Sequence, residues 1–270
     1  MVPVTSLAAL LVRTCHPAPT VAVTTLSVLL AVSAGHAAGV VVLVCLAVLT
    51  GQLCIGWSND LLDAERDRMV GRSDKLLATR TEARRFVWMA LAVAALACVV
   101  FSVLTGAWPA GVHLVLVVGS GLAYNLGLKR TLWSWLPYAL AFGALPSVVW
   151  LASEPPRAAP LWMMAVGALL GVGAHLLNAL PDLDDDAATG VRGLPHWLGP
   201  VAVPVVATGV LAAASIVAAL APPSGPTPWS WLGLGLVVLL GAAALAGRGK
   251  TPFRAAMGIA AVNVVLLVVG

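Results

Sequence analysis

Long apolar segments alternate with short polar ones along almost the whole chain. Most of the apolar segments are roughly 17 to 25 residues long, the length that a helix needs to cross a hydrocarbon core about 30 Å thick. They lack the strict alternation of apolar and polar residues that marks the strands of a membrane barrel. The pattern therefore predicts an all-α fold, a polytopic membrane bundle in which residues 1–270 form one domain. We expect nine spans, at about residues 20–34, 38–60, 84–105, 109–126, 133–152, 159–180, 197–221, 228–247 and 253–270.

The segment before the first expected span, residues 1–19, is only mildly apolar and carries Arg13. We interpret it as an interfacial segment. A cleaved signal peptide is the alternative, because small residues at 33–35 and 37–38 resemble a cleavage site. The interfacial interpretation is favoured, since Arg13 lies far from the terminus and the rest of the chain stays polytopic.

Composition supports a membrane protein. Hydrophobic residues make up 60% of the chain and charged residues only 10%, and the mean hydropathy is +0.99. A typical soluble domain is about a quarter charged. In a soluble protein the net charge of +4 would suggest nucleic acid as a partner, but here the basic residues lie in short loops between spans. We therefore expect a lipid bilayer and no nucleic acid as the partner.

The distribution of charge indicates the orientation of the chain. If the N-terminus lies in the cytoplasm, Arg157 is the single basic residue among 15 that falls on the outer side. Such a bias towards inner Lys and Arg sets the topology of membrane proteins. Glu154 is the single acidic residue on the outer side in this arrangement. We thus expect the charged chemistry to face the cytoplasm, in a bacterial plasma membrane.

Two acidic clusters end the second and the sixth expected spans. The first comprises Asn59, Asp60, Asp63 and Asp67, and the second comprises Asn178, Asp182 and Asp186. At about 100° per residue, each set falls within an arc of roughly 100° or less on its helix. Unpaired carboxylates at the foot of a membrane helix are costly, because like charges repel and burial disfavours ionisation. A divalent cation between the two faces would remove that cost.

The second cluster is expected to be less regular than the first. Pro181 donates no backbone hydrogen bond and crowds the preceding turn, so we expect a kinked or partly unwound helix end there. Asp184 and Asp185 could exchange roles with their neighbours in such a segment.

These residues carry a resemblance to a known family. Residues 59–67 match the pattern NDxxDxxxD, and residues 182–186 match DxxxD. The basic loop at 71–78 and the segment at 124–130 are also similar. By these motifs the chain resembles the UbiA superfamily of membrane prenyltransferases, including its terpene-cyclase branch. In two respects it differs: Leu76 stands where many members have proline, and the first motif lacks the features of the quinone, haem O and chlorophyll branches, so those acceptors are not favoured.

The resemblance implies a helical bundle around a central cavity, with both motifs at its cytoplasmic mouth and Mg²⁺ between them and the diphosphate of an isoprenyl donor. Mg²⁺ prefers oxygen ligands, which carboxylates and amide carbonyls supply. The expected metal ligands are Asp60, Asp63, Asp67, Asp182 and Asp186, of which all but Asp60 are also expected to be catalytic. The expected substrate-binding residues are Asn59, Arg72, Lys75, Tyr124, Lys129, His175 and Asn178.

Several of these assignments have structural alternatives. Arg72, Lys75 and Lys129 lie in loops just beyond the matched helix ends and suit the diphosphate, whereas Arg66 and Arg68 are expected to contribute less. Each basic residue could instead be solvated or bound to a lipid headgroup. Tyr124 suits either the cavity mouth or the membrane interface. The alternative for His175 is a hydrogen bond between helices.

Three classes of function are open to such a chain. The first is Mg²⁺-dependent transfer of a prenyl group to a lipophilic, aromatic acceptor, and the second is cyclisation of the same donor. The third, an ion carrier, is disfavoured because the acidic residues gather at one end of the spans and form no series across the bilayer.

Overall fold

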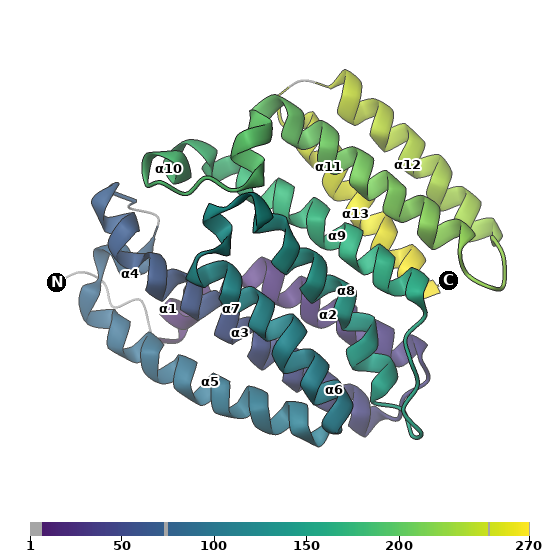
Figure 1. Ribbon diagram of the computed structural model, residues 1–270, viewed down its shortest axis with the longest axis horizontal. Coiled ribbons are helices and arrows are strands. Elements are labelled where there is room, and N and C mark those ends of the chain that lie inside the picture. The colour runs from purple at the N-terminus through teal and green to yellow at the C-terminus, as the bar shows by residue number, and fades with distance from the viewer. Residues whose placement is uncertain (1–6, 73–74, 248, 270) are drawn as a thin grey trace.

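The computed structural model describes residues 7–72, 75–247 and 249–269, and the regular elements in these ranges are all helices (Figure 1). The N-terminal half contains α1 (Leu7–Thr14), α2 (Pro17–Ser33), α3 (Ala38–Met69), α4 (Leu76–Thr79), η1 (Thr81–Ala83), α5 (Arg84–Leu104), α6 (Ala107–Val112), η2 (His113–Val118) and α7 (Gly119–Leu126). The C-terminal half contains η3 (Leu128–Arg130), η4 (Leu132–Trp135), α8 (Leu136–Leu151), α9 (Leu161–Ala179), η5 (Leu180–Asp182), α10 (Leu183–Ala188), α11 (Leu194–Leu220), α12 (Pro228–Ala246) and α13 (Thr251–Val269).

The number of spans agrees with the expectation. Among the described residues, eight helical segments are long and apolar enough to cross a bilayer, and α1 with α2 make a ninth if that pair, bent by 70°, forms one span. The chain is therefore a multi-pass integral membrane protein. The segment expected to be interfacial contains the short helix α1, and α2 begins at Pro17, a residue whose missing N–H costs nothing at a helix start.

Some helix bounds differ from the expected spans. The second expected span ends at residue 60, but α3 continues to Met69, so the whole first acidic cluster is helical. Apolar length alone ends a span at its last apolar residue, whereas charged residues extend a helix when they have partners. The fourth expected span, 109–126, is interrupted by the π-helical segment η2.

The bundle has two apolar cores. The larger one joins α2, α8, α9, α11 and α13 around side chains that are fully buried, such as Leu30, Leu145, Leu176 and Leu211. The smaller one joins α1, α3 and α5 around Leu61. Helix α3 contributes to both cores and thus connects them. This position makes the helix of the first acidic cluster central to the fold.

Helix α9 packs closely on α8 at the end of the larger core that lies nearest the acidic clusters. A Cβ atom at Gly171 would lie 2.3 Å from the carbonyl oxygen of Tyr138, so only glycine permits this approach. Small residues commonly allow such contact between membrane helices. The contact places His175, one turn after Gly171, beside Tyr138, with ring centroids 5.0 Å apart.

Helix α9 does not continue regularly into the second acidic cluster. The 3-10 turn Leu180–Asp182 separates α9 from α10, as expected from Pro181. Figure 1 shows α10 and α4 at the same end of the bundle. A cavity of about 410 Å³ lies at the opposite end, between segments 105–109 and 151–156, away from both acidic clusters.

Candidate active site

Three carboxylates of the first cluster line one buried face at the end of α3. The side chains of Asp60, Asp63 and Asp67 are 6%, 8% and 6% exposed, respectively. Their spacing of three and four residues keeps them on one side of a regular helix, as the sequence predicts. Leu62 and Glu65, which fall between them, are exposed. Helix α3 therefore directs its acidic face into the protein.

Two lysines from separate segments, Lys75 before α4 and Lys129 in η3, pair with this face. Lys75 Nζ lies 3.0 Å from Asp60 Oδ1, and Lys129 Nζ lies 2.5 and 2.6 Å from the two carboxylate oxygens of Asp63. The Lys129 side chain is only 5% exposed. Charge-assisted hydrogen bonds of this kind are stronger than neutral ones. The structure thus brings both lysines that the sequence assigns to the diphosphate against the first acidic cluster.

The two lysines differ in their pKa. Burial lowers the pKa of Lys129, and the opposing attraction of Asp63 does not overcome this, so the pKa lies below its ordinary value. Burial also lowers the pKa of Lys75, but the charge of Asp60, its hydrogen bond and the charges of Asp67 and Asp63 together raise it more, and the pKa ends above its ordinary value. Lys129 therefore releases its proton more readily than Lys75 does.

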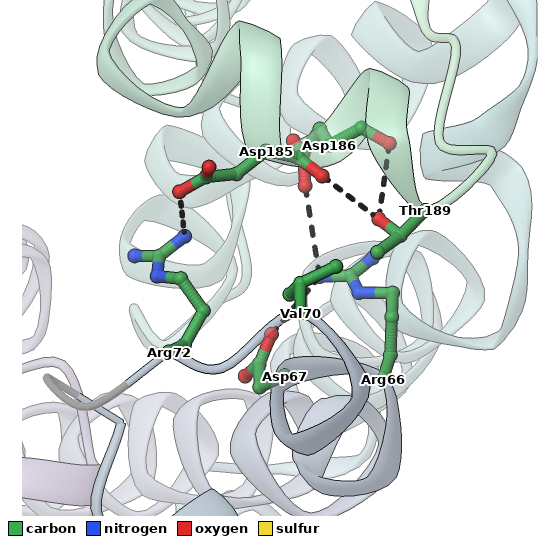
Figure 2. A pocket seen from close by; sticks show the side chains of 7 residues that line it. All are labelled: Arg66, Asp67, Val70, Arg72, Asp185, Asp186 and Thr189. Carbon is green, nitrogen blue, oxygen red and sulfur yellow. Dashed lines mark hydrogen bonds and ion pairs between the residues drawn. The ribbon is translucent and has the colours of Figure 1, made fainter.

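Arg66 connects the two acidic clusters. Its Nη2 atom lies 3.1 Å from Asp63 Oδ2, 3.7 Å from Asp67 Oδ1 and 3.6 Å from Asp186 Oδ1. One guanidinium nitrogen is therefore in ion-pair contact with carboxylates from α3 and α10. Figure 2 shows Arg66 and Asp67 on one side of a small pocket and Asp186 on the other.

Arg72, which lies just beyond the end of α3, pairs with the segment of the second cluster. Its Nη1 atom lies 3.2 Å from Asp182 Oδ1 and 3.1 Å from Asp185 Oδ2, the latter drawn in Figure 2. The second cluster thus turns Asp182 and Asp185 towards Arg72 and Asp186 towards Arg66. The 3-10 turn, which ends at Asp182, separates Asn178 on α9 from Asp186 on α10, so the three residues do not share one regular helical face, and this is the irregularity that Pro181 predicts.

Asn125 determines how Asn59 is oriented. Its amide nitrogen donates to the carbonyl oxygen of Ile55 (2.9 Å) and to Ser58 Oγ (2.9 Å). The Ile55 oxygen can only accept, so the Asn125 side-chain oxygen must face Asn59, whose amide nitrogen donates to it at 3.0 Å. The Asn59 carbonyl oxygen consequently points away from Asn125 and is the atom left for another partner.

This geometry makes Asn125→Ala a test of orientation. We expect turnover to fall by about 10- to 100-fold, as for other groups that orient a metal-binding residue, together with a loss of about 1–3 kcal/mol in stability from unpaired buried groups. Asn263→Ala is the matched control, because Asn263 is also buried and donates to a carbonyl oxygen, that of Leu211 at 2.8 Å, in another part of the bundle. Assays of turnover and thermal unfolding compare the two variants. Equal activity in both would show that Asn125 has no role in orienting Asn59.

An aromatic group lies next to the acidic clusters. The ring of Tyr124 is 5.3 Å from that of Tyr138 and 5.8 Å from that of His175, in edge-to-face contact with each. Asn178 is exposed, and its side chain lies near Tyr138. The structure therefore gathers Tyr124, His175 and Asn178, three of the expected substrate-binding residues, around Tyr138.

His175 makes the hydrogen bond between segments that the sequence offered as its structural alternative. Its Nε2 atom lies 3.0 Å from Ser134 Oγ, and the same oxygen atom accepts a hydrogen bond from the Leu194 backbone N–H at 2.9 Å. His175 is 2% exposed, and its Nδ1 atom has no hydrogen-bond partner among the described residues. The histidine therefore joins α9 to the turn before α8 as well as packing against the tyrosines.

Sequence reasoning undervalued or missed three residues. Arg66 was expected to contribute little, although helical geometry places it roughly 20° from Asn59 at the edge of the acidic face. Asp185 was left open, and the 3-10 turn brings it to Arg72. No motif in the sequence marks His16, yet its Nε2 atom lies 3.0 Å from Asp60 Oδ1.

The donors at this end of the bundle suit Mg²⁺ in kind. The structure collects carboxylates from both clusters, and the Asn59 carbonyl oxygen would offer a neutral donor beside them. Hard oxygen donors of this sort are those that Mg²⁺ prefers. Within the described ranges, no three acidic, histidine or cysteine side chains converge on a ready-made metal position. Basic side chains lie between the carboxylates instead, Arg66 foremost. The residues therefore fit a metal bound together with an anionic ligand better than a closed structural site.

Comparison with known proteins gives a matching family and a curated relative. The model of the UbiA prenyltransferase family matches residues 19–264. A curated relative, the bacteriochlorophyll synthase 33 kDa chain of Cereibacter sphaeroides, is 32% identical over 180 residues, which cover 63% of this chain and 59% of the relative. This chain thus spans less than two thirds of that relative's length.

Two solved structures share the fold. A UbiA homolog from Archaeoglobus fulgidus, bound to GPP and Mg²⁺, is 16% identical and superposes with a TM-score of 0.69, covering 96% of this chain and 98% of that one. The apo structure of a UbiA homolog from Aeropyrum pernix K1 is 21% identical, with a TM-score of 0.70 and coverage of 93% and 97%. At these identities the likeness establishes the helical architecture.

Proposed function

The chain belongs to the UbiA prenyltransferase family, and we propose that it is a Mg²⁺-dependent membrane enzyme that ionises an isoprenyl diphosphate and transfers the prenyl group to a lipophilic, aromatic acceptor. The observation that carries this proposal is the contact between the two acidic clusters, which Arg66 joins through Asp63 and Asp186. The bias of basic residues supports a cytoplasmic position for this end of the bundle. A bacterial plasma membrane is the proposed location.

The carboxylates and the basic residues have complementary tasks in this reaction. Mg²⁺, when bound by the aspartates, would neutralise charge on the diphosphate oxygens. Arg72, Lys75 and Lys129 lie within reach of the same region and offer positive charge to the departing diphosphate. Arginine can grip a phosphate with two parallel hydrogen bonds, and lysine acts as a point charge. Carboxylates and basic side chains together thus supply what a diphosphate leaving group requires.

The proposed reaction replaces a proton of the acceptor with the prenyl group of the donor. The allylic C1–O bond of the donor breaks, and its electron pair leaves with the diphosphate. The acceptor then supplies an electron pair that forms the bond to C1, and it releases its proton to the diphosphate or to water. The aromatic rings of Tyr124 and Tyr138, next to the acidic clusters, can stabilise the cation through their faces.

The relatives support the class of donor and widen the choice of acceptor. The homolog from Archaeoglobus fulgidus binds GPP, an isoprenyl diphosphate, together with Mg²⁺. The first motif did not favour the chlorophyll branch, yet the curated relative is named as a bacteriochlorophyll synthase chain. Tetrapyrroles therefore belong among the acceptors to be tested, beside phenols and quinone precursors.

The deciding experiment incubates the purified protein with Mg²⁺ and geranyl, farnesyl or geranylgeranyl diphosphate, with and without a panel of acceptors. We expect diphosphate release and a prenylated product only when an acceptor is present, and no turnover in EDTA. A cyclic hydrocarbon or alcohol formed without an acceptor would show that the protein cyclises its donor and does not transfer the prenyl group. Magnesium flux through reconstituted protein without any diphosphate cleavage would instead indicate an ion carrier.

A further inference from the structure

The bend between α1 and α2 holds His16 in an uncommon backbone conformation. Its φ of 55° is the one positive φ of a residue other than glycine in the part of the chain that the structure describes. The left-handed region is unfavourable for side chains with a Cβ atom, although histidine enters it more often than most. Residues kept in such a conformation cluster at functional sites, where surrounding contacts compensate the strain.

Helix α3 itself holds the bend in place. A Cβ atom at Gly56 would lie 2.4 Å from the Cys15 carbonyl oxygen, so the bend packs directly on this glycine. The adjacent Trp57 donates its indole N–H to the Leu11 carbonyl oxygen at 3.0 Å. Gly56 and Asp60 are four residues apart and therefore share one face of α3. The contact that fixes the bend thus lies one turn before the first aspartate of the acidic cluster.

The imidazole of His16 reaches that aspartate. His16 Nε2 lies 3.0 Å from Asp60 Oδ1, and Lys75 Nζ lies 3.0 Å from the same oxygen atom. Asp60 is 6% exposed, so its carboxylate has little access to water. Two donors from two separate segments hold Oδ1, and Oδ2 makes neither contact. This arrangement restrains rotation of the carboxylate about its side-chain bonds.

We propose that His16 is a positioning residue of the metal site: seated on Gly56 and Trp57 by the α1–α2 bend, it holds Asp60 in the orientation that presents the carboxylate to Mg²⁺. The inference rests on the proposed function, because it takes Asp60 to be a metal ligand. It extends the site to the N-terminal segment, which carries neither acidic motif. His16 acts through Asp60 and needs no contact with the substrate.

Metal binding, measured with and without inorganic diphosphate, tests this role directly. Mn²⁺ binding to the purified protein is followed by electron paramagnetic resonance, in which free and bound ions are distinguished. His16→Asn keeps a residue that tolerates positive φ but shortens the side chain, and we expect it to raise the Kd for Mn²⁺ by about 10- to 100-fold. His16→Gln, whose amide can reach Asp60, should recover part of the affinity. His36→Asn is the control, because His36 contacts the Val149 carbonyl oxygen at 2.9 Å, away from the acidic clusters.

A second variant displaces the bend and leaves His16 unchanged. Gly56→Ala introduces a Cβ atom against the backbone of Cys15, so we expect a similar loss of Mn²⁺ affinity. Gly39→Ala on the same helix is its matched control, since a Cβ atom there meets nothing within 4 Å. The loss of metal affinity should also appear in the turnover of His16→Asn and Gly56→Ala. Both variants should need more Mg²⁺ for half-maximal rate, and saturating Mg²⁺ should restore most of kcat.

The outcomes separate the two proposals. Wild-type affinity for Mn²⁺ in both His16→Asn and Gly56→Ala would overturn the role of His16 while the proposed function stands. A lower thermal stability with unchanged metal affinity would likewise overturn it and leave His16 as an anchor of α1. If the unaltered protein binds no Mn²⁺, with or without diphosphate, the proposed function fails and this inference fails with it.

Discussion

Asp63→Asn is expected to lower turnover of the isoprenyl diphosphate by on the order of 10³-fold. Asp63 contacts both Lys129 and Arg66, and through Arg66 it is joined to Asp186 of the second cluster. A metal site stabilises a departing anion by several kcal/mol, and each 1.36 kcal/mol corresponds to about tenfold in rate. Steady-state assays of diphosphate release at saturating Mg²⁺ measure the loss.

The control for Asp63→Asn separates catalysis from folding. Removing one partner of a buried ion pair costs about 3–5 kcal/mol in general, because the other charge stays buried and unpaired. Here the lowered pKa of Lys129 eases loss of its proton and limits that cost. The double variant Asp63→Asn/Lys129→Met removes both charges and should unfold close to the temperature of the wild type. A double variant that is folded and fully active would refute the role of Asp63.

Asp186→Asn is expected to lower turnover by about 10²- to 10³-fold. Asp186 is the residue of the second cluster that approaches the first, since its Oδ1 atom lies 3.6 Å from Arg66 Nη2. The same side chain lines the pocket between the clusters with Arg66 and Arg72. Loss of its charge weakens the electrostatic stabilisation of the leaving diphosphate. Rates measured across a range of Mg²⁺ concentrations would show whether binding of the metal or the chemical step is affected.

Asp184→Asn is the matched control, because the same change is made two residues away on the same short helix. Asp184 is exposed, and it belongs to neither the Arg66 nor the Arg72 contact. We expect its turnover to stay within about twofold of the wild type, as for most surface substitutions. Equal losses in Asp184→Asn and Asp186→Asn would mean that the cluster acts only through its total charge.

The long apolar segments predicted the helices of the bundle well, because the length of a span and the period of a helix are local properties of the chain. The bounds were less well predicted. Apolar length cannot show that α3 continues to Met69, because that last stretch is stabilised by contacts with residues far away in the sequence. Likewise, Pro181 predicted a break after α9, but the direction that the chain takes after the break was not predictable from it.

The sequence by itself determined the membrane class, the nine expected spans and two oxygen-rich clusters, since hydrophobic length and helical spacing need no knowledge of partners. Only the tertiary structure decided which side chains meet. Arg66 bridges two helix ends, Asp185 turns towards Arg72 after a 3-10 turn, and His16 reaches Asp60 from a bend seated on α3. Each of these contacts depends on how segments more than 40 residues apart pack or on a local break in helical geometry. No periodic pattern along one helix records that information.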